Sequence, residues 1–506
     1  MLTPCDLYDM LERSAERFPD KAAVIDDEET VTYAQMKRRV DALAAEFYGT
    51  FGLRRGMQAG VLMVNSAKTL SAFYALARLG CVAVMMNTKY RESEIRNLLS
   101  DLDAKLIVCD EMWLDKVQKT AKEMQIPVCV KEEFPSGEPG DEDRFGVLNL
   151  PESGNNADLP CVMMHTSGTT GKPKGILVTQ RNIMEAAYGY EAVQKLTCDD
   201  VTVLSVPLFH ILGLSCVSTM FIHLGGTIIL SAFYNVRDVL DKIRKYRATH
   251  FHSVPAIYLQ MLAAEDPEKD LSSVRTAICG GAPVSEEDAE AICRMMPNAV
   301  FRRAYGMTET AGSGTLSLVH RGPLHAVPNM YCTVADKEHH PLPAGVRGEI
   351  VFHGAPVARG RWKAEDLTED AVFSGDVGWM DEEGNVFVEG RIKDIINRGG
   401  EKIFPIKIEL LLEQFPGIRE AAVYAVRSEQ YGEVPAAALT VREGEKPDPE
   451  AMRRYLKEHI ASFEMPVYMD IMDSLPVTQN GKIKKAELRR QKEAELFPDG
   501  KENRNI

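Results

Sequence analysis

Apolar runs alternate with helix-periodic stretches from about residue 20 to residue 310. The runs GVLMV (60–64) and KLIVC (105–109) are each followed by apolar residues at helical spacing. Runs this continuously apolar are typical of parallel strands buried on both faces. Strand and helix at this spacing predict an α/β fold of mostly parallel sheets covered by helices. The same prediction applies to TIIL (227–230), HFHSV (250–254) and RTAICGG (275–281).

The pattern changes twice in the second half of the chain. After about residue 320, glycine and proline punctuate strand-like runs such as GEIVFHG (348–354) and GNVFVEG (384–390), which predicts a β-rich lobe. Beyond residue 390, helix and strand patterns follow one another over a length typical of a small α+β domain. We therefore predict a large N-terminal domain, residues 1–390, and a small C-terminal domain, residues 391–506.

One long apolar stretch has two interpretations. Residues 201–236 contain no Asp, Glu, Lys or Arg, and a membrane helix needs about 20 predominantly apolar residues. A proline, two histidines and the Gly225-Gly226 pair interrupt this stretch. We therefore predict a buried helix near residues 209–223, a glycine turn and a buried strand, and we disfavour a membrane span.

The chain is long and acidic. Its 506 residues exceed what one ordinary core organises, and its net charge of −15 disfavours nucleic acid as a partner. The ten cysteines are scattered and form no CxxC motif, so buried thiols in a reducing compartment are expected. The N-terminal stretch has early acidic residues and no apolar core, so no signal peptide is expected and we predict a cytoplasmic protein.

The candidate chemistry begins at HTSGTTGKPKG (165–175). Glycine-rich backbone, hydroxyls and ammonium groups all attract phosphate. The spacing fails the P-loop pattern, because Pro173 stands where that pattern requires a glycine. The flanking CVMMH and ILVT look like strands, whereas a P-loop opens a helix.

This setting predicts a loop between two strands that closes over a triphosphate and opens again. A solvated hairpin tip is the alternative. The residues predicted to bind phosphate in this loop are Thr166, Ser167, Gly168, Thr169, Thr170, Gly171, Lys172 and Lys174.

The loop resembles the phosphate-loop signature of the adenylate-forming superfamily, which contains acyl-CoA synthetases, carrier-protein adenylation domains and luciferases. Further motifs that resemble those of the superfamily follow in order, so the resemblance covers essentially the whole chain. They are PLFHILG (207–213), CGGAPVS (279–285), YGMTET (305–310), SGDVGW (374–379), GRIKDIINRGGEKIFPIKIE (390–409) and PVTQNGKIKK (476–485).

The resemblance implies a two-step reaction that uses ATP, Mg²⁺ and coenzyme A. A carboxylate attacks the α-phosphate of ATP to give acyl-AMP and pyrophosphate, and a thiol then displaces AMP. Because an anion must approach a polyanion in the first step, cations and positioning matter more than a covalent nucleophile. The resemblance also implies that the small domain is mobile and swings about a hinge at Lys393 between the two steps.

The resemblance assigns roles to residues of the predicted N-terminal domain. Glu309 would help to hold Mg²⁺, and Thr308 would hydrogen-bond phosphate. Tyr305 would stack on adenine, and His210 would gate the acid pocket. The other residues expected at the ATP site are Gly306 and Met307 beside Tyr305, and Gly280, Gly281 and Ala282 at the end of a strand, where α/β sheets bind ligands.

The remaining groups come from later motifs, with Asp376 near the end of the predicted N-terminal domain and the others in the predicted C-terminal domain. Asp376, with Arg391 assisting, would accept hydrogen bonds from the ribose hydroxyls. Gly399 and Gly400 would approach the site in the second step and shape a thiol tunnel. Lys482 follows the tight-turn dipeptide Asn-Gly, and it would bridge the incoming carboxylate and the α-phosphate.

Three functions stay open at this stage. The leading hypothesis is an acid–thiol ligase that makes an acyl-CoA, and the near alternative is a stand-alone enzyme that loads the pantetheine of a carrier protein. A catalytically silent nucleotide-binding protein is disfavoured because Lys482, Glu309 and Asp376 are all present. The expected partners are a small carboxylic acid, ATP and coenzyme A, with no nucleic acid and no membrane span, and a homodimer is left open.

Overall fold

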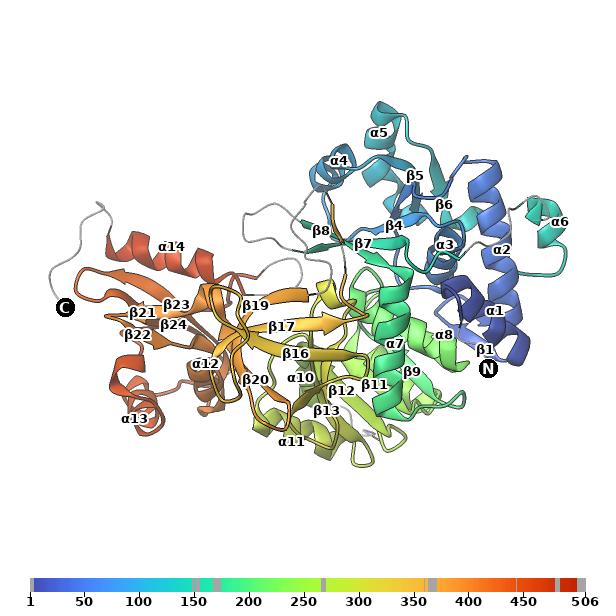
Figure 1. Cartoon of the computed structure of the whole chain (residues 1–506). Coiled ribbons are helices and arrows are strands. Elements are labelled where there is room, and N and C mark those ends of the chain that lie inside the picture. Colours follow the sequence, from blue (N-terminus) through green and yellow to red (C-terminus); the bar gives the residue numbers. More distant parts are fainter. Residues whose placement is uncertain are drawn as a thin grey trace. The chain divides into compact units, whose positions relative to one another are not determined.

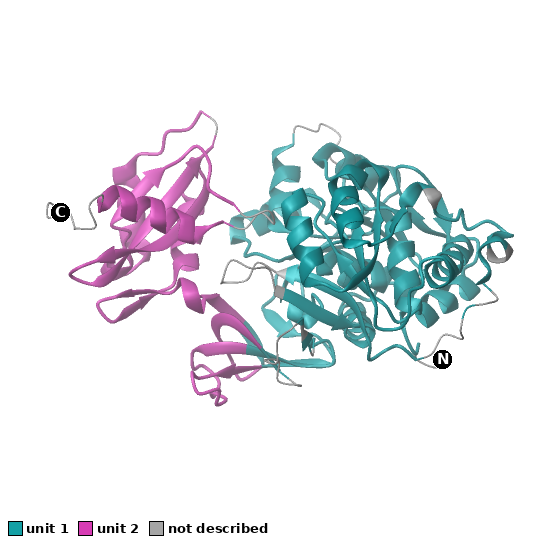
Figure 2. Cartoon of the chain, turned by 90° about the horizontal axis from the view of Figure 1, so that it is seen from above, with its two compact units in different colours: residues 1–332, 351–372, 384–386 teal, residues 333–350, 373–383, 387–506 magenta. Residues whose placement is uncertain are grey.

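The computed structural model describes residues 4–147, 150, 155–166, 174–264, 270–358, 360–362, 371–442, 444–477 and 483–497 (Figure 1). The chain divides into two compact units (Figure 2). Unit 1 comprises residues 1–332, 351–372 and 384–386, and unit 2 comprises residues 333–350, 373–383 and 387–506. The domain boundary placed between residues 390 and 391 stays a prediction.

The larger sheet of unit 1 is mostly parallel. Its strands follow the order β15-β14-β13-β12-β11-β9-β10-β1-β2. Neighbours from β1 to β13 pair in parallel, and β2, β14 and β15 add antiparallel pairs at the two sides. The sequence predicted three of these strands. The bounds are β1 Ala22–Ile25, β2 Thr30–Thr32, β9 Val201–Leu204, β10 Thr227–Leu230, β11 His250–Ser253, β12 Thr276–Gly280, β13 Val300–Gly306, β14 Gly314–Ser317 and β15 Leu324–Ala326.

The second sheet of unit 1 follows the order β18-β8-β7-β4-β3-β5-β6. The strands from β7 to β6 pair in parallel, and β8 and β18 are antiparallel additions at one edge. This arrangement confirms the predicted α/β class. The bounds are β3 Gln58–Leu62, β4 Val82–Met85, β5 Ala104–Cys109, β6 Val128–Val130, β7 Pro160–Thr166, β8 Lys174–Thr179 and β18 Gly360–Arg361.

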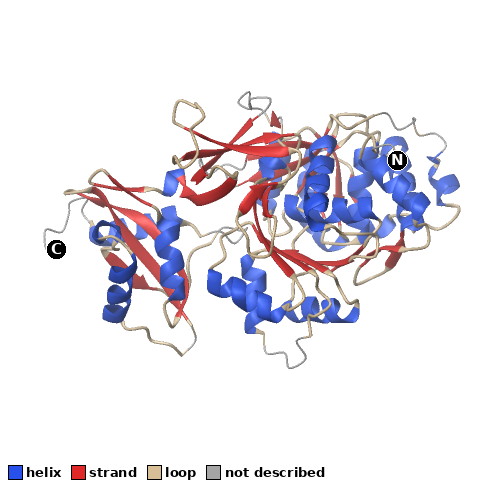
Figure 3. Cartoon of the chain, turned by 60° about the horizontal axis from the view of Figure 1, so that its bottom comes forward, coloured by secondary structure: helices blue, strands red, loops and turns tan. Residues whose placement is uncertain are grey.

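Helices connect and cover these strands, as Figure 3 shows by colour. The helix after β12 begins after Ser285, whose hydroxyl accepts from the Asp288 N–H at 3.0 Å, which confirms the predicted N-cap. The bounds are α1 Leu7–Arg17, α2 Tyr33–Gly49, α3 Ala67–Arg78, α4 Glu92–Asp101, α5 Leu114–Met124, α6 Asp141–Phe145, α7 Gln180–Gln194, α8 Met220–Leu224, α9 Val236–Lys245, α10 Pro255–Ala263 and α11 Glu286–Met295.

The uncharged stretch forms a buried helix, a turn and a strand, as predicted. Its first part is a π-helix, η4 (Leu212–Thr219), which continues into α8. The Ser218 and Thr219 hydroxyls donate to the carbonyls of Gly213 and Leu214, at 2.7 and 2.9 Å. In the part of the chain that the structure describes, no helix is long and apolar enough to cross a membrane.

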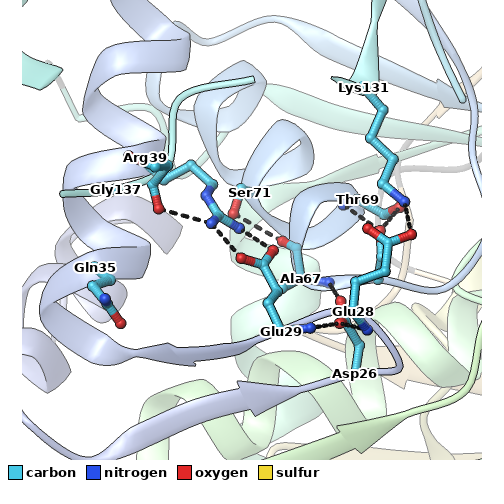
Figure 4. A network of polar contacts seen from close by, with 12 residues as sticks. Asp26, Glu28, Glu29, Gln35, Arg39, Ala67, Thr69, Ser71, Lys131 and Gly137 are labelled. Atoms are coloured by element: carbon cyan, nitrogen blue, oxygen red, sulfur yellow. Dashed lines mark hydrogen bonds and ion pairs between the residues drawn. The ribbon is translucent and has the colours of Figure 1, made fainter. Parts of the chain in front are cut away.

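Two buried cations, Arg39 and Lys131, form ion pairs that tie the turn at residues 26–29 to the rest of unit 1 (Figure 4). The Arg39 guanidinium, 2% exposed, donates to the two carboxylate oxygens of Glu29 at 2.6 and 2.7 Å. Lys131, 5% exposed, pairs with Glu28 at 2.8 Å. Because a buried charge is costly unless it is paired, these contacts fix the turn beside the N-terminus of α3.

The predicted β-rich lobe is confirmed. Its strands follow the order β16-β17-β19-β20, and β20 continues into the larger sheet by pairing antiparallel with β15 at Val386 and Asn385. The division between the units passes through these strands. The Trp379 and Phe387 rings stack at 4.1 Å within unit 2. The bounds are β16 Met330–Ala335, β17 Gly348–Gly354, β19 Ala371–Met380 and β20 Asn385–Arg391.

The rest of unit 2 is an α+β arrangement with its own core. β23 and β24 form a long antiparallel pair, and β25 adds to β24 in parallel. One core cluster joins α12 and α13 to this sheet through side chains such as Ile408, Leu412 and Leu456. The bounds are β21 Ile396–Arg398, β22 Glu401–Ile403, α12 Pro405–Gln414, β23 Ile418–Ser428, β24 Gly432–Val441, α13 Pro449–His459, β25 Tyr468–Ile471 and α14 Lys485–Leu496.

Candidate active site

The glycine loop connects two antiparallel strands. β7 and β8 pair from Met163 and Leu177 up to Thr166 and Lys174, which confirms that the loop joins strand to strand. The Trp362 N–H donates to the Gly175 carbonyl at 2.8 Å, so β18 braces the outer strand at the base of the loop. The predicted phosphate ligands Ser167, Gly168, Thr169, Thr170, Gly171 and Lys172 lie outside the described residues.

The predicted adenine wall lies at the carboxyl edge of the larger sheet. β12 ends at Gly280, which pairs in parallel register with Ala304 of β13. Gly281 then turns with φ +83°, a conformation that favours glycine, and Ala282 is exposed. The structure thus places two of the predicted motifs on neighbouring strands at the same edge, although they are about twenty-five residues apart in sequence.

The YGMTET motif is a strand end followed by one turn of 3-10 helix, Thr308–Thr310. The Tyr305 ring packs against Phe352 at 5.4 Å. The Ala358 N–H donates to the Glu309 backbone carbonyl at 2.7 Å, which anchors the turn through its main chain. Tyr305, Thr308 and Glu309 lie at the end of β13 and in the turn that follows it, and all three are half-buried.

Gly306 is required by a close approach of the backbone. A Cβ atom at this position would lie 2.1 Å from the carbonyl oxygen of Ser313. The Thr310 hydroxyl also donates to that carbonyl, which fixes the returning chain. The close packing at Gly306 therefore sets the position of the turn that carries Glu309.

We expect Gly306→Ala to lower the rate of acyl-AMP formation at least about 10-fold, because the methyl group must displace the backbone at residue 313, and overpacking of this kind costs about 1–3 kcal/mol. The measurement is ATP–pyrophosphate exchange together with thermal unfolding. Gly49→Ala is the matched control, because its Cβ would meet no atom within 4 Å. Equal activity of the two variants would contradict the argument.

His210 lies just before η4, and its ring packs against Phe209 at 4.7 Å. Asn65 holds the segment that leads to it. The Asn65 side chain donates to the Val206 carbonyl at 3.0 Å and accepts from the Leu208 N–H at 2.8 Å. Asn65 was not among the residues predicted from the sequence, where the available signal was a polar residue directly after the predicted strand GVLMV.

The two residues predicted to bind the ribose, Asp376 and Arg391, both lie in unit 2. The Asp376 carboxylate, 6% exposed, pairs with the Arg391 Nε at 2.8 Å. Arg391 also donates to the Ser374 carbonyl at 3.2 Å, and Gly375 between them has φ +73°. The structure therefore brings together the two residues that the sequence placed fifteen positions apart, with the carboxylate oriented by the guanidinium.

The hinge and thiol-side residues follow in unit 2. Lys393 lies in a short 3-10 turn, Ile392–Asp394. Gly399 and Gly400 form the turn between β21 and β22, with φ +59° and +98°. The Gly399 N–H donates to the Tyr431 carbonyl at 2.8 Å, which fixes the turn to the loop between β23 and β24.

Lys482, the predicted catalytic lysine, lies outside the described residues. The described residues nearest to it are Val477 and Ile483. These two form an antiparallel bridge, and the Lys484 N–H donates to the Pro476 carbonyl at 2.8 Å.

Glu309 is a single carboxylate, so it could hold a magnesium ion only together with oxygen atoms of the substrate. Among the described residues, no group of three or more His, Cys, Asp or Glu side chains could form a metal site. Mg²⁺ bound beside nucleotide phosphates typically uses one or two carboxylates, phosphate oxygens and waters. One carboxylate at the strand edge therefore fits an ion that arrives with ATP.

Comparison with known proteins decides the family. The family model for AMP-binding enzyme matches residues 11–362, and that for the AMP-binding enzyme C-terminal domain matches residues 407–482. The chain belongs to the AMP-binding enzyme family. Membership confirms the prediction of an AMP-forming acid–thiol ligase that uses ATP, Mg²⁺ and coenzyme A.

Relatives of this AMP-binding enzyme match it over almost its whole length. Feruloyl-CoA synthase of an Amycolatopsis species is 32% identical over 94% of this chain and 97% of that protein. Fatty acid–[acyl-carrier-protein] ligase ScoC of Streptomyces coeruleorubidus is 29% identical over 94% of each. The Bacillus subtilis o-succinylbenzoate coenzyme A synthetase, solved with ATP and magnesium ion, is 26% identical, with a TM-score of 0.81 over 95% of this chain and 98% of that one.

Proposed function

We propose that this AMP-binding enzyme activates a mainly apolar monocarboxylic acid and transfers the acyl group to coenzyme A. The observation that carries the proposal is the carboxyl edge of the larger sheet, where Gly280, Gly306 and Glu309 lie on adjacent strand ends. Residues 212–219 and 311–316, which follow His210 and Glu309 in the chain, contain no charged residue. They offer no arginine for a second carboxylate.

The proposed roles divide between the two steps. In the first, the glycine loop holds the β- and γ-phosphates with Thr166 and Lys174 at its ends, and Lys482 stabilises the charge that builds up between the carboxylate and the α-phosphate. In the second, the turn at Gly399 and Gly400 lies beside the entering thiol. Lys393 is the proposed hinge between the two arrangements.

The nucleotide contacts are proposed for both steps. Asp376 accepts from the ribose hydroxyls, because a carboxylate offers two oxygens with several acceptor positions. Tyr305 stacks on adenine, and Thr308 donates to phosphate. The Glu309 carboxylate would hold Mg²⁺, which would supply charge neutralisation on the phosphates when it is bound.

The test is pyrophosphate release over a panel of carboxylic acids, with and without coenzyme A. We expect release with at least one monocarboxylic acid, and acyl-CoA formation when coenzyme A is added. The absence of AMP and pyrophosphate with every acid would contradict the function. Turnover with a holo carrier protein but not with coenzyme A would favour the carrier-loading alternative, which is the activity named for the Streptomyces relative.

Two further properties are part of this proposal. A cytoplasmic location is supported by the ten cysteines, all of which lie among the described residues as free thiols, most of them buried. A homodimer is the hypothesis carried over from the sequence, and light scattering of the purified protein distinguishes it from a monomer.

A further inference from the structure

One face of the larger sheet carries a buried polar side chain, that of His252 in β11. β11 alternates, so that His250 and His252 share a face and Phe251 points to the other side, where its ring meets Tyr258 of α10 at 5.3 Å. Helix α7 covers the histidine face: its Tyr190 ring stacks on His252 at 5.7 Å. His252 pairs in register with Ile278 of β12, and Ile278 with Arg302 of β13, so the same face continues over both residues.

This face leads directly to the nucleotide edge. Along β12 it passes from Ile278, level with His252, to Gly280, the first residue of the predicted adenine wall. At about 3.3 Å per residue, the two levels are about 7 Å apart. Helices α7 and η4 pack together over this face, and η4 begins two residues after His210. The layer between the strands and these helices therefore starts at the adenylation chemistry and ends at His252.

His252 has no polar partner there. It is 1% exposed, and neither ring nitrogen has a hydrogen-bond partner among the described residues. Burial lowers the pKa of His252 well below its usual range, so the ring is neutral and offers one donor and one acceptor. His250, on the same strand and face, has one partner: its Nδ1 pairs with the Thr202 hydroxyl at 2.9 Å, while its Nε2 has none among the described residues.

One further buried hydroxyl lies near the site. Ser313, whose carbonyl approaches Gly306, is fully buried, and its hydroxyl has no partner among the described residues. A buried polar group without a partner is costly, and each such group in a folded protein calls for an explanation. For His252, which lies on the face that leads to Gly280, a polar atom of the ligand would supply the missing partner.

We propose that the acid substrate carries a hydrogen-bonding group at the end remote from its carboxylate, such as a hydroxyl on a ring or chain, and that His252 reads this group. The proposal rests on the proposed function, because it assigns the substrate class of that same site. The carboxylate lies at the strand edge and the body of the acid extends inward past η4. The flat stack of Tyr190 and His252 suits an aryl body in particular.

The experiment compares matched acids that differ only in the remote hydroxyl: 4-hydroxycinnamate with cinnamate, 4-hydroxybenzoate with benzoate, and 8-hydroxyoctanoate with octanoate. The readout is kcat/KM for pyrophosphate release by the full-length enzyme. For at least one pair, we expect the hydroxylated acid to be preferred by about 10-fold or more, because a site built for a hydroxyl leaves its own polar groups unpaired with the analogue. The pair with the largest preference shows which distance between carboxylate and hydroxyl matches the distance from the strand edge to His252.

His252→Phe is the test variant, since it keeps a flat ring beside Tyr190 and removes both polar atoms. We expect the preference to fall to about 1-fold or to invert, with the parent acid turned over at least as well as by the wild type. His252→Gln, which keeps a donor and an acceptor, should retain part of the preference. Phe251→Leu, on the opposite face of the same strand, is the matched control and should leave the ratio unchanged.

The outcomes separate the inference from the function on which it rests. If no acid of any kind releases pyrophosphate, the proposed function fails. If parent acids are activated and His252→Phe leaves every hydroxyl-to-parent ratio unchanged, the function stands and the inference is wrong, with a buried water as the partner of His252. A melting temperature of His252→Phe within a few degrees of the wild type confirms that the ratio reports recognition rather than unfolding.

Discussion

Substitution of Lys482 by alanine is expected to abolish acyl-AMP formation and to leave thioester formation from supplied acyl-AMP largely intact. In the proposed reaction this ammonium group is needed only while a carboxylate approaches the α-phosphate. Loss of one preorganised group of this kind typically lowers the rate about 100- to 1000-fold. ATP–pyrophosphate exchange measures the first step, and acyl-CoA formation from synthetic acyl-AMP measures the second.

Lys484→Ala is the matched control for this substitution. Lys484 is two residues away, and its exposed side chain pairs with Glu487 at 3.5 Å. Exposed pairs of this kind contribute about 0–1 kcal/mol, so both steps should keep nearly their full rates. If Lys482→Ala slowed both steps to the same extent, the account with two arrangements of the C-terminal part would be wrong.

Asp376→Asn is expected to have the second large effect, and to impair both steps. The substitution removes the carboxylate proposed to hold the ribose, which is bound as ATP in the first step and as acyl-AMP in the second. Hydrogen bonds to charged groups are worth about 1.5–3 kcal/mol each, so the KM for ATP should rise about 10- to 100-fold. Steady-state kinetics in both half-reactions provide the measurement.

The fold should tolerate this change. The Arg391 side chain is 43% exposed, so water compensates for the lost ion pair. Glu389→Gln on the neighbouring strand β20 is the control, because Glu389 pairs with Arg347 at 2.7 Å and has no proposed role. An unchanged KM for ATP in the Asp376→Asn variant would show that Asp376 does not bind the nucleotide.

The elements of the fold were predictable where the pattern is local. The runs at 227–230 and 348–354 are strands with those same bounds, because continuous apolar or alternating residues favour one backbone state over a few positions. The strand-to-strand setting of the glycine loop followed from its two apolar flanks. The predicted helix near 209–223 exists, but its π-helical first part follows from hydrogen bonds such as that from Ser218 to Gly213, which periodicity does not reveal.

The candidate site was predictable only in part. Ordered motifs with specific residue types pointed to Tyr305, Glu309, Asp376 and Arg391, and the structure shows the last two as an ion pair. Asn65 was missed, because its two hydrogen bonds reach residues more than 140 positions away in the chain. The only signal at its own position was a polar residue directly after a predicted strand, which does not reveal these distant partners.

The sequence by itself determined the order of elements, the glycine loop and the motif residues, because each depends on neighbours a few positions apart. Only the tertiary structure decided which groups share a face and which lack a partner. His250 and His252 are equivalent in the sequence, yet the first meets Thr202 of β9 and the second meets no polar atom among the described residues. The physical reason is that register and close packing, as at Gly306 and Ser313, arise from contacts between distant segments.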